Sequence, residues 1–301
     1  MGPMDPVTFR GKTALITGGN GGIGLGISRG LAAGGARLLI PVHNRTRGEI
    51  TAATLRAEFP GADIKLFSLD LESLASVRAL SAQLRKCGEP IHLAMLNAGV
   101  VRLAEGPREV TVDGFEATFQ ANYLGHIALI TAIMRLLRAG SARVVAQVSL
   151  AADRGRIHWE NLQGETGYRS FTAYSQSKVA LGLSTVELAR RSQDHGWGIS
   201  AGLAHPGVVP GSGIAPRLRR MFPAGMVHWA ERTLGNPPAQ AAGPALAALA
   251  SRESCMWAPS RWSETAGPAV KRTPFSSLTD LGDAARLWGA TESLLGICAA
   301  Q

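Results

Sequence analysis

The chain has 301 residues, of which 46% are hydrophobic and 18% are charged. This length and composition suit one large α/β domain with a buried core, and they exclude a largely disordered protein. The net charge of +9 comes mainly from arginine, since only five residues are lysine. The basic residues are scattered without a run or aromatic interleaving, so we expect no nucleic-acid partner.

The three cysteines, Cys87, Cys255 and Cys298, are far apart and match no metal-binding or redox spacing. We therefore expect reduced thiols, no metal site and a cytoplasmic location. The amino terminus lacks the apolar core of a signal peptide. No apolar run reaches the roughly 18 residues that a membrane span needs, so none is expected.

Residues 12–17 form a short apolar run that predicts a buried strand, and a glycine-rich turn follows it. A helical pattern then continues to Ala33. Glycine lets the backbone approach a ligand closely, and the N–H groups that open a helix attract anions. We predict that this turn binds a dinucleotide pyrophosphate, with a plain βα turn as the alternative. The candidate residues are Gly18, Asn20, Gly22, Ile23 and Gly24.

Residues 37–42 predict the second strand, and the segment after it bears on the cofactor. An acidic residue there would bind a ribose 2′-hydroxyl, whereas basic residues would pair with a 2′-phosphate. Residues 43–47 read H-N-R-T-R, with no acid before Glu49. Charge matching therefore favours NADP(H), with NAD(H) as the alternative. The two arginines could also lie in a solvated first helical turn. The candidate residues are His43, Asn44 and Arg45.

Three more strands are predicted at residues 64–68, 91–96 and 143–149. The first of these strands leads into Asp70-Leu71, and the second leads into Asn97-Ala98-Gly99. The third strand ends at Ser149. Asp70 could also cap the predicted helix 72–86. Residues 110–137 predict one long helix, which carries Asn122 and His126; we expect His126 to be a packing residue. A Ser at the carboxyl end of a strand faces the crevice where α/β folds bind ligands.

Residues 174–178 read Y-S-Q-S-K, within apolar residues at helical spacing. Residues four apart on a helix share a face, so the Tyr174 hydroxyl and the Lys178 ammonium can point into one space. A nearby cation lowers the pKa of a phenol, and such a phenol can exchange a proton with an alcohol or a ketone. An exposed Tyr–Lys pair without a role is the alternative.

Residues 197–204 predict the sixth strand, and His205-Pro206-Gly207-Val208 follow it. Large apolar residues within 214–234 favour either a bulky, mostly apolar substrate or ordinary helix packing. A helix at 239–251, a last strand at 255–257 and a terminal helix at 283–293 complete the pattern.

Taken together, T-G-x-x-x-G-x-G at 17–24, N-A-G at 97–99 and Y-x-x-x-K at 174–178 resemble the short-chain dehydrogenase/reductase family. The resemblance covers residues 8–288, and the segment before Tyr174 resembles the retinol-dehydrogenase-like and protochlorophyllide-reductase-like branch. It implies a single Rossmann-type α/β domain: a doubly wound parallel sheet of about seven strands flanked by helices. The implied halves are a cofactor-binding part (about 8–150) and a catalytic and substrate part (about 151–301) with a lid near 208–234.

The resemblance also implies roles for single residues. Asp70 and Leu71 would contact adenine, and the N-A-G segment would lie beside the adenine ribose. Ser149 would hold the substrate oxygen, and Tyr174 would exchange its proton. Lys178 would lower the pKa of Tyr174 and bind ribose hydroxyls, and Asn122 would hold a relay water. The implied nicotinamide-side residues are Pro206, Gly207 and Val208.

We therefore expect an NADPH-dependent reductase of ketones or aldehydes, acting on a small molecule in bacterial secondary metabolism. The same residues could oxidise an alcohol with NADP⁺. A non-catalytic NADP(H)-binding scaffold or sensor is the third alternative, and the joint presence of Asn122, Ser149, Tyr174 and Lys178 argues against it. We expect a monomer or a homodimer.

Overall fold

The computed structural model describes residues 9–102, 106–209, 236, 238–261 and 264–297. The predicted lid lies outside these residues from position 210 onward, as does Cys298. Within the described part of the chain, no helix combines the length and the apolar character needed to cross a bilayer.

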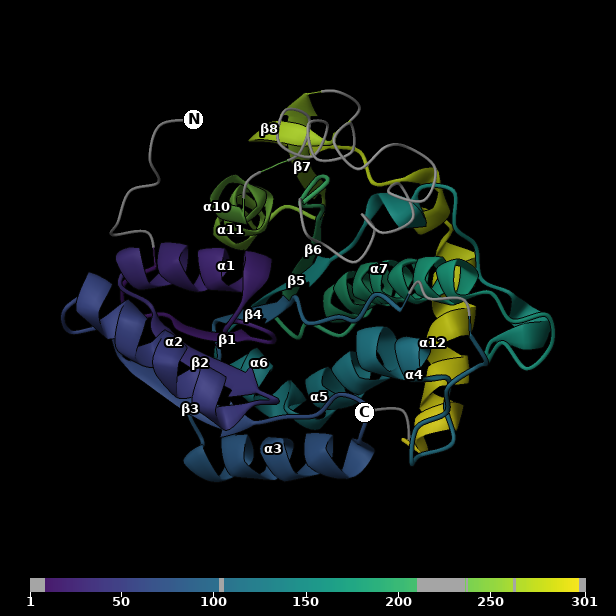
Figure 1. The fold of residues 1–301 in the computed structure, drawn as a ribbon, viewed down its shortest axis with the longest axis horizontal. Helices are drawn as coiled ribbons and strands as arrows, with labels where there is room; N and C mark the ends of the chain where they lie inside the picture. Colours follow the sequence, from purple (N-terminus) through teal and green to yellow (C-terminus); the bar gives the residue numbers. More distant parts are fainter. Residues whose placement is uncertain (1–8, 103–105, 210–235, 237, 262–263, 298–301) are drawn as a thin grey trace.

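One eight-stranded sheet forms the centre of the fold, in the order β3-β2-β1-β4-β5-β6-β7-β8 (Figure 1). The strands are β1 (Thr13–Ile16), β2 (Arg37–Val42), β3 (Ile64–Ser68), β4 (Leu93–Leu96), β5 (Arg143–Gln147), β6 (Ser200–Ala204), β7 (Met256–Arg261) and β8 (Ala266–Arg272). Neighbours from β3 to β7 pair in parallel, and β8 is antiparallel to β7. The predicted doubly wound sheet is confirmed, with one strand more than the approximate count expected. β8 escaped prediction because it is a half-exposed edge strand that contains Gly267 and Pro268.

Helices cover both faces of this sheet (Figure 1). They are α1 (Gly22–Ala33), α2 (Arg45–Glu58), α3 (Leu74–Cys87), α4 (Ala117–Phe119), α5 (Gly125–Ala132), α6 (Met134–Ala139), α7 (Ser170–Asp194), α10 (Pro238–Ala241), α11 (Gly243–Ala250) and α12 (Leu281–Leu295). Residues of α1, α2 and α11 pack into one apolar cluster, and residues of α3, α5, α7 and α12 pack into another. The sheet therefore has a core on each face, as a doubly wound fold requires.

Residues 110–137 do not form the single long helix expected from the sequence. Val110 and Glu116 pair as an isolated antiparallel bridge, and α4 begins only at Ala117. The Glu116 carboxylate accepts hydrogen bonds from the N–H groups of Thr118 (3.0 Å) and Phe119 (2.6 Å), which caps the helix start. The chain then makes a π-helical turn, Gln120–Leu124, before α5. Such turns are frequent at functional sites, and this one carries Asn122.

The carboxyl-terminal helix α12 packs across α7 (Figure 1). Between them the hydroxyl of Tyr123 lies 2.8 Å from Ser184 Oγ on α7 and 2.5 Å from Thr291 Oγ1 on α12. The contact ties the π-helical turn to both helices. It thereby fixes the turn that bears Asn122 against the helix that bears Tyr174 and Lys178.

Candidate active site

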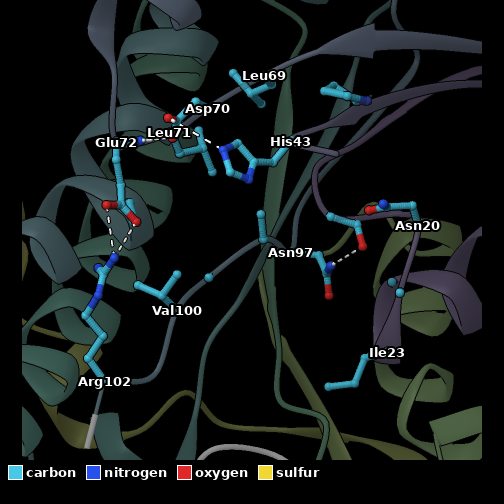
Figure 2. Close-up of a pocket in the computed structure, with 17 residues that line it drawn as sticks. Asn20, Ile23, His43, Leu69, Asp70, Leu71, Glu72, Asn97, Val100 and Arg102 are labelled. Atoms are coloured by element: carbon cyan, nitrogen blue, oxygen red, sulfur yellow. Dashed lines mark hydrogen bonds and ion pairs between the residues drawn. The ribbon is translucent and has the colours of Figure 1, made fainter. Parts of the chain in front are cut away.

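A cleft of about 660 Å³ opens where the carboxyl ends of β1, β2, β3 and β4 meet (Figure 2). The predicted cofactor-binding residues that line it are Gly18, Asn20, Ile23, Gly24, His43, Asp70, Leu71, Asn97, Ala98 and Gly99. They come from four separate segments of the chain. The cleft lies at the switch point of the sheet, where the strand order reverses between β1 and β4, which is where doubly wound folds bind ligands.

The glycine turn before α1 is built for close backbone contact. Gly18 has a φ of +66°, which side-chain-bearing residues rarely adopt. A Cβ on Gly24 would lie 2.0 Å from the Gly18 carbonyl oxygen, so the turn can approach the helix only because residue 24 is glycine. No side chain caps the start of α1 at Gly21. The first N–H groups of α1 are therefore available to an anion. Together with the glycine turn they form a phosphate cradle that fits a pyrophosphate.

Hydrogen bonds join the N-A-G segment to β1 and to the π-helical turn. Thr17 Oγ1 accepts from the N–H groups of Asn97 and Ala98, each at 3.0 Å. His126 lies 3.0 Å from the same hydroxyl through Nε2, and 3.1 Å from the Asn122 carbonyl oxygen through Nδ1. Because a carbonyl oxygen only accepts, Nδ1 donates and Nε2 accepts. Burial lowers the pKa of His126 to about 4, so the ring is neutral. His126 thus connects Thr17, after β1, with Asn122 of the π-helical turn through hydrogen bonds. The sequence alone predicts only a packing role for it.

Of the basic residues in the segment 43–47, His43 is the one that lines the cleft, and it lies beside Asp70 (Figure 2). Its side chain is 82% exposed, and Nε2 lies 3.9 Å from Asp70 Oδ2. Asn44 instead caps α2 by accepting from the N–H of Arg47 at 2.9 Å. Arg45 pairs with Glu49 one helical turn away, at 2.9 Å. Asn44, Arg45 and Gly22 are not among the residues that line the cleft.

An ion pair at the mouth of the cleft was not foreseen. Arg102 Nη2 donates to both carboxylate oxygens of Glu72, at 2.8 and 3.0 Å, and Arg102 Nε lies 3.1 Å from Glu109 Oε2 (Figure 2). Both Glu72 and Arg102 line the cleft. The two residues are 30 positions apart and belong to no motif, so nothing in the sequence signals their contact.

The four predicted catalytic residues are all buried, and two of them, Asn122 and Lys178, lie beside the N-A-G segment. Their exposed fractions are 0% for Asn122, 8% for Ser149 and 5% each for Tyr174 and Lys178. A Cβ on Gly99 would be 3.0 Å from Asn122 Oδ1 and 3.2 Å from Lys178 Nζ, so the cleft and the buried residues are in direct contact. The structure therefore places Lys178 of α7 and Asn122 of the π-helical turn against the loop after β4. Ser149 lies two residues past the end of β5, which is shorter than the strand predicted over 143–149, and is hydrogen-bonded to Tyr174.

Specific hydrogen bonds hold these side chains. Asn122 Oδ1 accepts from the N–H of Val100 at 2.7 Å, and Nδ2 donates to Val100 O and to Ser177 Oγ, both at 3.0 Å. Lys178 Nζ donates to the carbonyl oxygen of Gln147 at 3.1 Å. Both hydrogens of the Asn122 amide are thus used within the protein, and Oδ1 keeps one lone pair.

Burial shifts both ionisable groups toward their neutral forms. It lowers the pKa of Lys178 to about 8. It raises the pKa of Tyr174, an effect that a hydrogen bond with Ser149 partly offsets. The lowering of the Tyr174 pKa expected from Lys178 is not seen: the loss of hydration dominates, and it is the hydrogen bond with Ser149 that acts against it.

The segment after β6 is anchored by the β7–β8 hairpin and by Asn236. Gly207 has a φ of +83°, and a Cβ there would be 2.3 Å from the Thr265 carbonyl oxygen. The N–H of Val208 donates to that oxygen at 2.8 Å. Asn236 donates from its N–H to Val208 O at 2.7 Å and from Nδ2 to Pro206 O at 3.0 Å. Sequence reasoning missed Asn236, which follows the segment predicted as a lid and belongs to no motif.

Residues 12–221 match the family model described as short chain dehydrogenase. The chain belongs to the short-chain dehydrogenase family. Among curated proteins, this short-chain dehydrogenase is 39% identical to retinol dehydrogenase 12 of Mus musculus over 204 residues, which cover 67% of the chain and 63% of the relative. It is 36% identical to polyprenol dehydrogenase of Mus musculus over 204 residues, covering 66% of the chain and 60% of the relative. The match thus spans less than two thirds of these relatives' own length.

Solved structures resemble the short-chain dehydrogenase over more of its length. An uncharacterised protein from Mycobacterium Paratuberculosis has a TM-score of 0.76 at 28% identity, covering 97% of this chain and 96% of the other. The Pseudomonas aeruginosa RhlG/NADP active-site complex has a TM-score of 0.63 at 27% identity, covering 82% of this chain and 93% of the other. The predicted family and its retinol-dehydrogenase-like branch are confirmed by these similarities.

Proposed function

We propose that this chain is an NADP(H)-dependent oxidoreductase that reduces a ketone or aldehyde on a bulky, mostly apolar small molecule. The observation that carries the proposal is the contact of Gly99, which lines the cleft, with Asn122 and Lys178, two members of the buried set that also includes Ser149 and Tyr174. A proton donor of this kind next to a dinucleotide site is what hydride transfer to a carbonyl requires. A role in bacterial secondary metabolism belongs to the same proposal.

Three features support NADP(H) as the cofactor. The glycine turn offers uncapped helix N–H groups to a pyrophosphate. Asp70 and the N-A-G segment line the cleft in the order that an adenosine half would need. His43 lines the cleft beside Asp70, where it would meet a 2′-phosphate, and RhlG, a relative at 27% identity, is named as an NADP complex. When bound, the nicotinamide cofactor supplies or accepts the hydride.

The chain's own residues would manage the proton and the substrate oxygen. Ser149 donates a hydrogen bond to the substrate oxygen and keeps it within reach of Tyr174. Tyr174 delivers the phenolic proton to that oxygen in reduction and takes it back in oxidation. Lys178 is still largely protonated at pH 7 with a pKa of about 8, so it stabilises the phenolate that proton delivery leaves. Asn122 holds a relay water through the free lone pair of Oδ1.

A Tyr174→Phe variant tests the proposal. It removes the proton donor and keeps the ring, so we expect turnover of retinal or an aromatic ketone to fall by roughly 10²–10⁴-fold. Fluorescence titration should show NADPH affinity within about twofold of the original, because the ring still fills its place. Tyr168→Phe is the matched control, since Tyr168 donates to Glu116 at 3.0 Å, outside the buried set. Normal turnover by Tyr174→Phe would exclude Tyr174 as the proton donor.

Oxidation of an alcohol is the second candidate function. It is supported by the names of the curated relatives, retinol dehydrogenase and polyprenol dehydrogenase. Both directions use the same residues, so initial rates with retinol and NADP⁺ against retinal and NADPH decide between them. A non-catalytic NADP(H)-binding scaffold predicts no turnover in either direction.

A further inference from the structure

The side chain of Gln147, the last residue of β5, is buried without a partner. Its exposed fraction is 5%, and neither Nε2 nor Oε1 has a hydrogen-bond partner among the described residues. Burying an amide without partners costs the free energy of its lost hydration, and an apolar side chain of the same shape would avoid that cost. The free donor and the free acceptor therefore point to a ligand that offers both.

The position of Gln147 places this amide between the two halves of the active site. Lys178 Nζ donates a hydrogen bond to the backbone carbonyl oxygen of Gln147, and Ser149 lies two residues after Gln147 in the sequence. Side chains alternate along a strand, so Gln147 shares the face of Val145. The register partner of Gln147 on β6 is Ala204. Both Val145 and Ala204 belong to the apolar cluster that contains residues of α1 and α11. The amide thus lies on the face covered by α1, whose first turn forms the phosphate cradle, while α7 lies on the other face.

Three polar backbone groups of the segment that follows β6 are already used within the protein. Val208, on the segment that continues from β6, uses its N–H for Thr265 O at 2.8 Å. Its carbonyl oxygen accepts from the N–H of Asn236 at 2.7 Å. Asn236 Nδ2 also occupies the Pro206 carbonyl oxygen. The side chain of Gln147 is therefore a buried group at this edge of the sheet that keeps both a free donor and a free acceptor among the described residues.

We propose that the Gln147 side chain binds the carboxamide of the nicotinamide ring and so fixes which way the ring faces. A primary amide pairs with a primary amide through two hydrogen bonds, with Nε2 donating to the carboxamide oxygen and Oε1 accepting from its NH₂ group. The assignment rests on the proposed NADP(H) site and adds a residue that selects the nicotinamide end of the cofactor. Gln147 acts by positioning and transfers no proton.

Direct binding measurements test this with the variant Gln147→Leu. NADPH affinity should fall about tenfold, which corresponds to about 1.4 kcal/mol for the two neutral hydrogen bonds. The reduced 3-acetylpyridine analogue of NADP has a methyl group in place of the carboxamide NH₂, so its affinity should fall by only about threefold. Affinity for 2′,5′-ADP, which has no nicotinamide, should not change. Isothermal titration or fluorescence gives all three without turnover.

Gln176→Leu is the matched control. Gln176 is also buried, at 4% exposure, but its amide is fully used: Oε1 accepts from the N–H of His158 at 2.8 Å, and Nε2 donates to Leu162 O at 2.9 Å. Without cofactor, Gln176→Leu should unfold at a lower urea concentration than the original protein. Gln147→Leu should unfold at the same or a higher concentration, because it removes an unpaired buried amide.

The outcomes separate this proposal from the proposed function. If the original protein binds neither NADPH nor the analogue, the proposed function fails. If it binds both and Gln147→Leu binds them equally well, only the role of Gln147 fails. An equal loss for NADPH, analogue and 2′,5′-ADP would mean a structural defect, and a rise in substrate KM with unchanged NADPH affinity would mean a substrate contact. Either result overturns the carboxamide assignment.

Discussion

At the scale of single residues, His43 is the basic side chain of the segment 43–47 that lines the cleft. Arg45 lies nearby in the sequence, but its guanidinium is held by Glu49. We predict that His43→Ala weakens NADPH binding by roughly two- to fivefold, as expected for an exposed charge contact, and leaves NADH binding unchanged. Arg45→Ala is the control and should change neither affinity. A larger loss of NADPH affinity in Arg45→Ala than in His43→Ala would show that the arginine reads the phosphate instead.

Several residues of the site could be found from the sequence because their signals are local. The glycine turn, Asp70 and the N-A-G segment each follow a short apolar strand, and Tyr174 and Lys178 lie one helical turn apart. The pairing of Arg102 with Glu72 could not be found, since it depends on how two distant loops fold over the cleft. The unpaired amide of Gln147 is likewise a property of its surroundings and not of its position in a motif.

At the scale of elements, Arg143 joins β5 to its neighbours through carbonyl oxygens, with no carboxylate paired to it among the described residues. The side chain is 1% exposed and donates to the carbonyl oxygens of Ala248 (2.9 Å), Ala201 (2.8 Å) and Glu253 (2.7 Å). Burial lowers the pKa of Arg143 to about 10, so the guanidinium stays charged at pH 7. A Cβ on Gly202 would be 2.2 Å from Arg143 Nη2. The hydrogen bonds that join β5, β6 and the end of α11 therefore require both Arg143 and Gly202.

We predict that Arg143→Met and Gly202→Ala each lower the free energy of unfolding by about 1–3 kcal/mol. Arg143→Met leaves three carbonyl oxygens without their donor, and Gly202→Ala adds a methyl group where there is no space for it. The double variant should lose less than the sum, because the added methyl group occupies space that the guanidinium leaves. Urea unfolding of the four proteins measures this. Arg252→Met, at an exposed arginine that also donates to two carbonyl groups, is the control and should cost little. Strictly additive losses would contradict the predicted contact.

The elements also show where local patterns mislead. The sequence of 110–137 has helical spacing throughout, but the Glu116 cap and the π-helical turn divide it. These features depend on contacts across the fold, such as Tyr123 with α7 and α12. The half-exposed strand β8 has no regular alternation of buried and exposed residues, so a pattern search passes over it.

At the scale of the whole molecule, two fully buried neutral histidines make stability depend on pH. Burial lowers the pKa values of His126 and His205 to about 4, below the value near 6.5 expected in the unfolded chain. Between these values the unfolded state binds more protons, so stability falls as the pH decreases from about 6.5 to about 4. Each histidine should contribute about 1.4 kcal/mol per pH unit within this window.

Urea unfolding at several pH values between 7.5 and 4.5 checks this prediction. His126→Asn should reduce the slope of the unfolding free energy against pH by about half of the histidine contribution, whatever its effect at pH 7.5. His195→Asn is the control, because His195 is exposed and makes the same kind of contact to a carbonyl oxygen one turn earlier, at 2.9 Å from Arg191 O. An unchanged slope in His126→Asn would mean that His126 is not neutral in the folded protein.

The π-helical turn Gln120–Leu124 makes this part of the chain tolerant of a shorter sequence. A π-helical turn holds one residue more than an α-helix between the same ends. Losing one residue there would leave a continuous α-helix from α4 into α5, so the frame of the fold would persist. Asn122, inside the turn, would however change its direction relative to the flanking helices, since a shift by one residue on an α-helix is a rotation of about 100°. A deletion at this turn is therefore a route by which descendants of the chain could keep the fold and lose the chemistry.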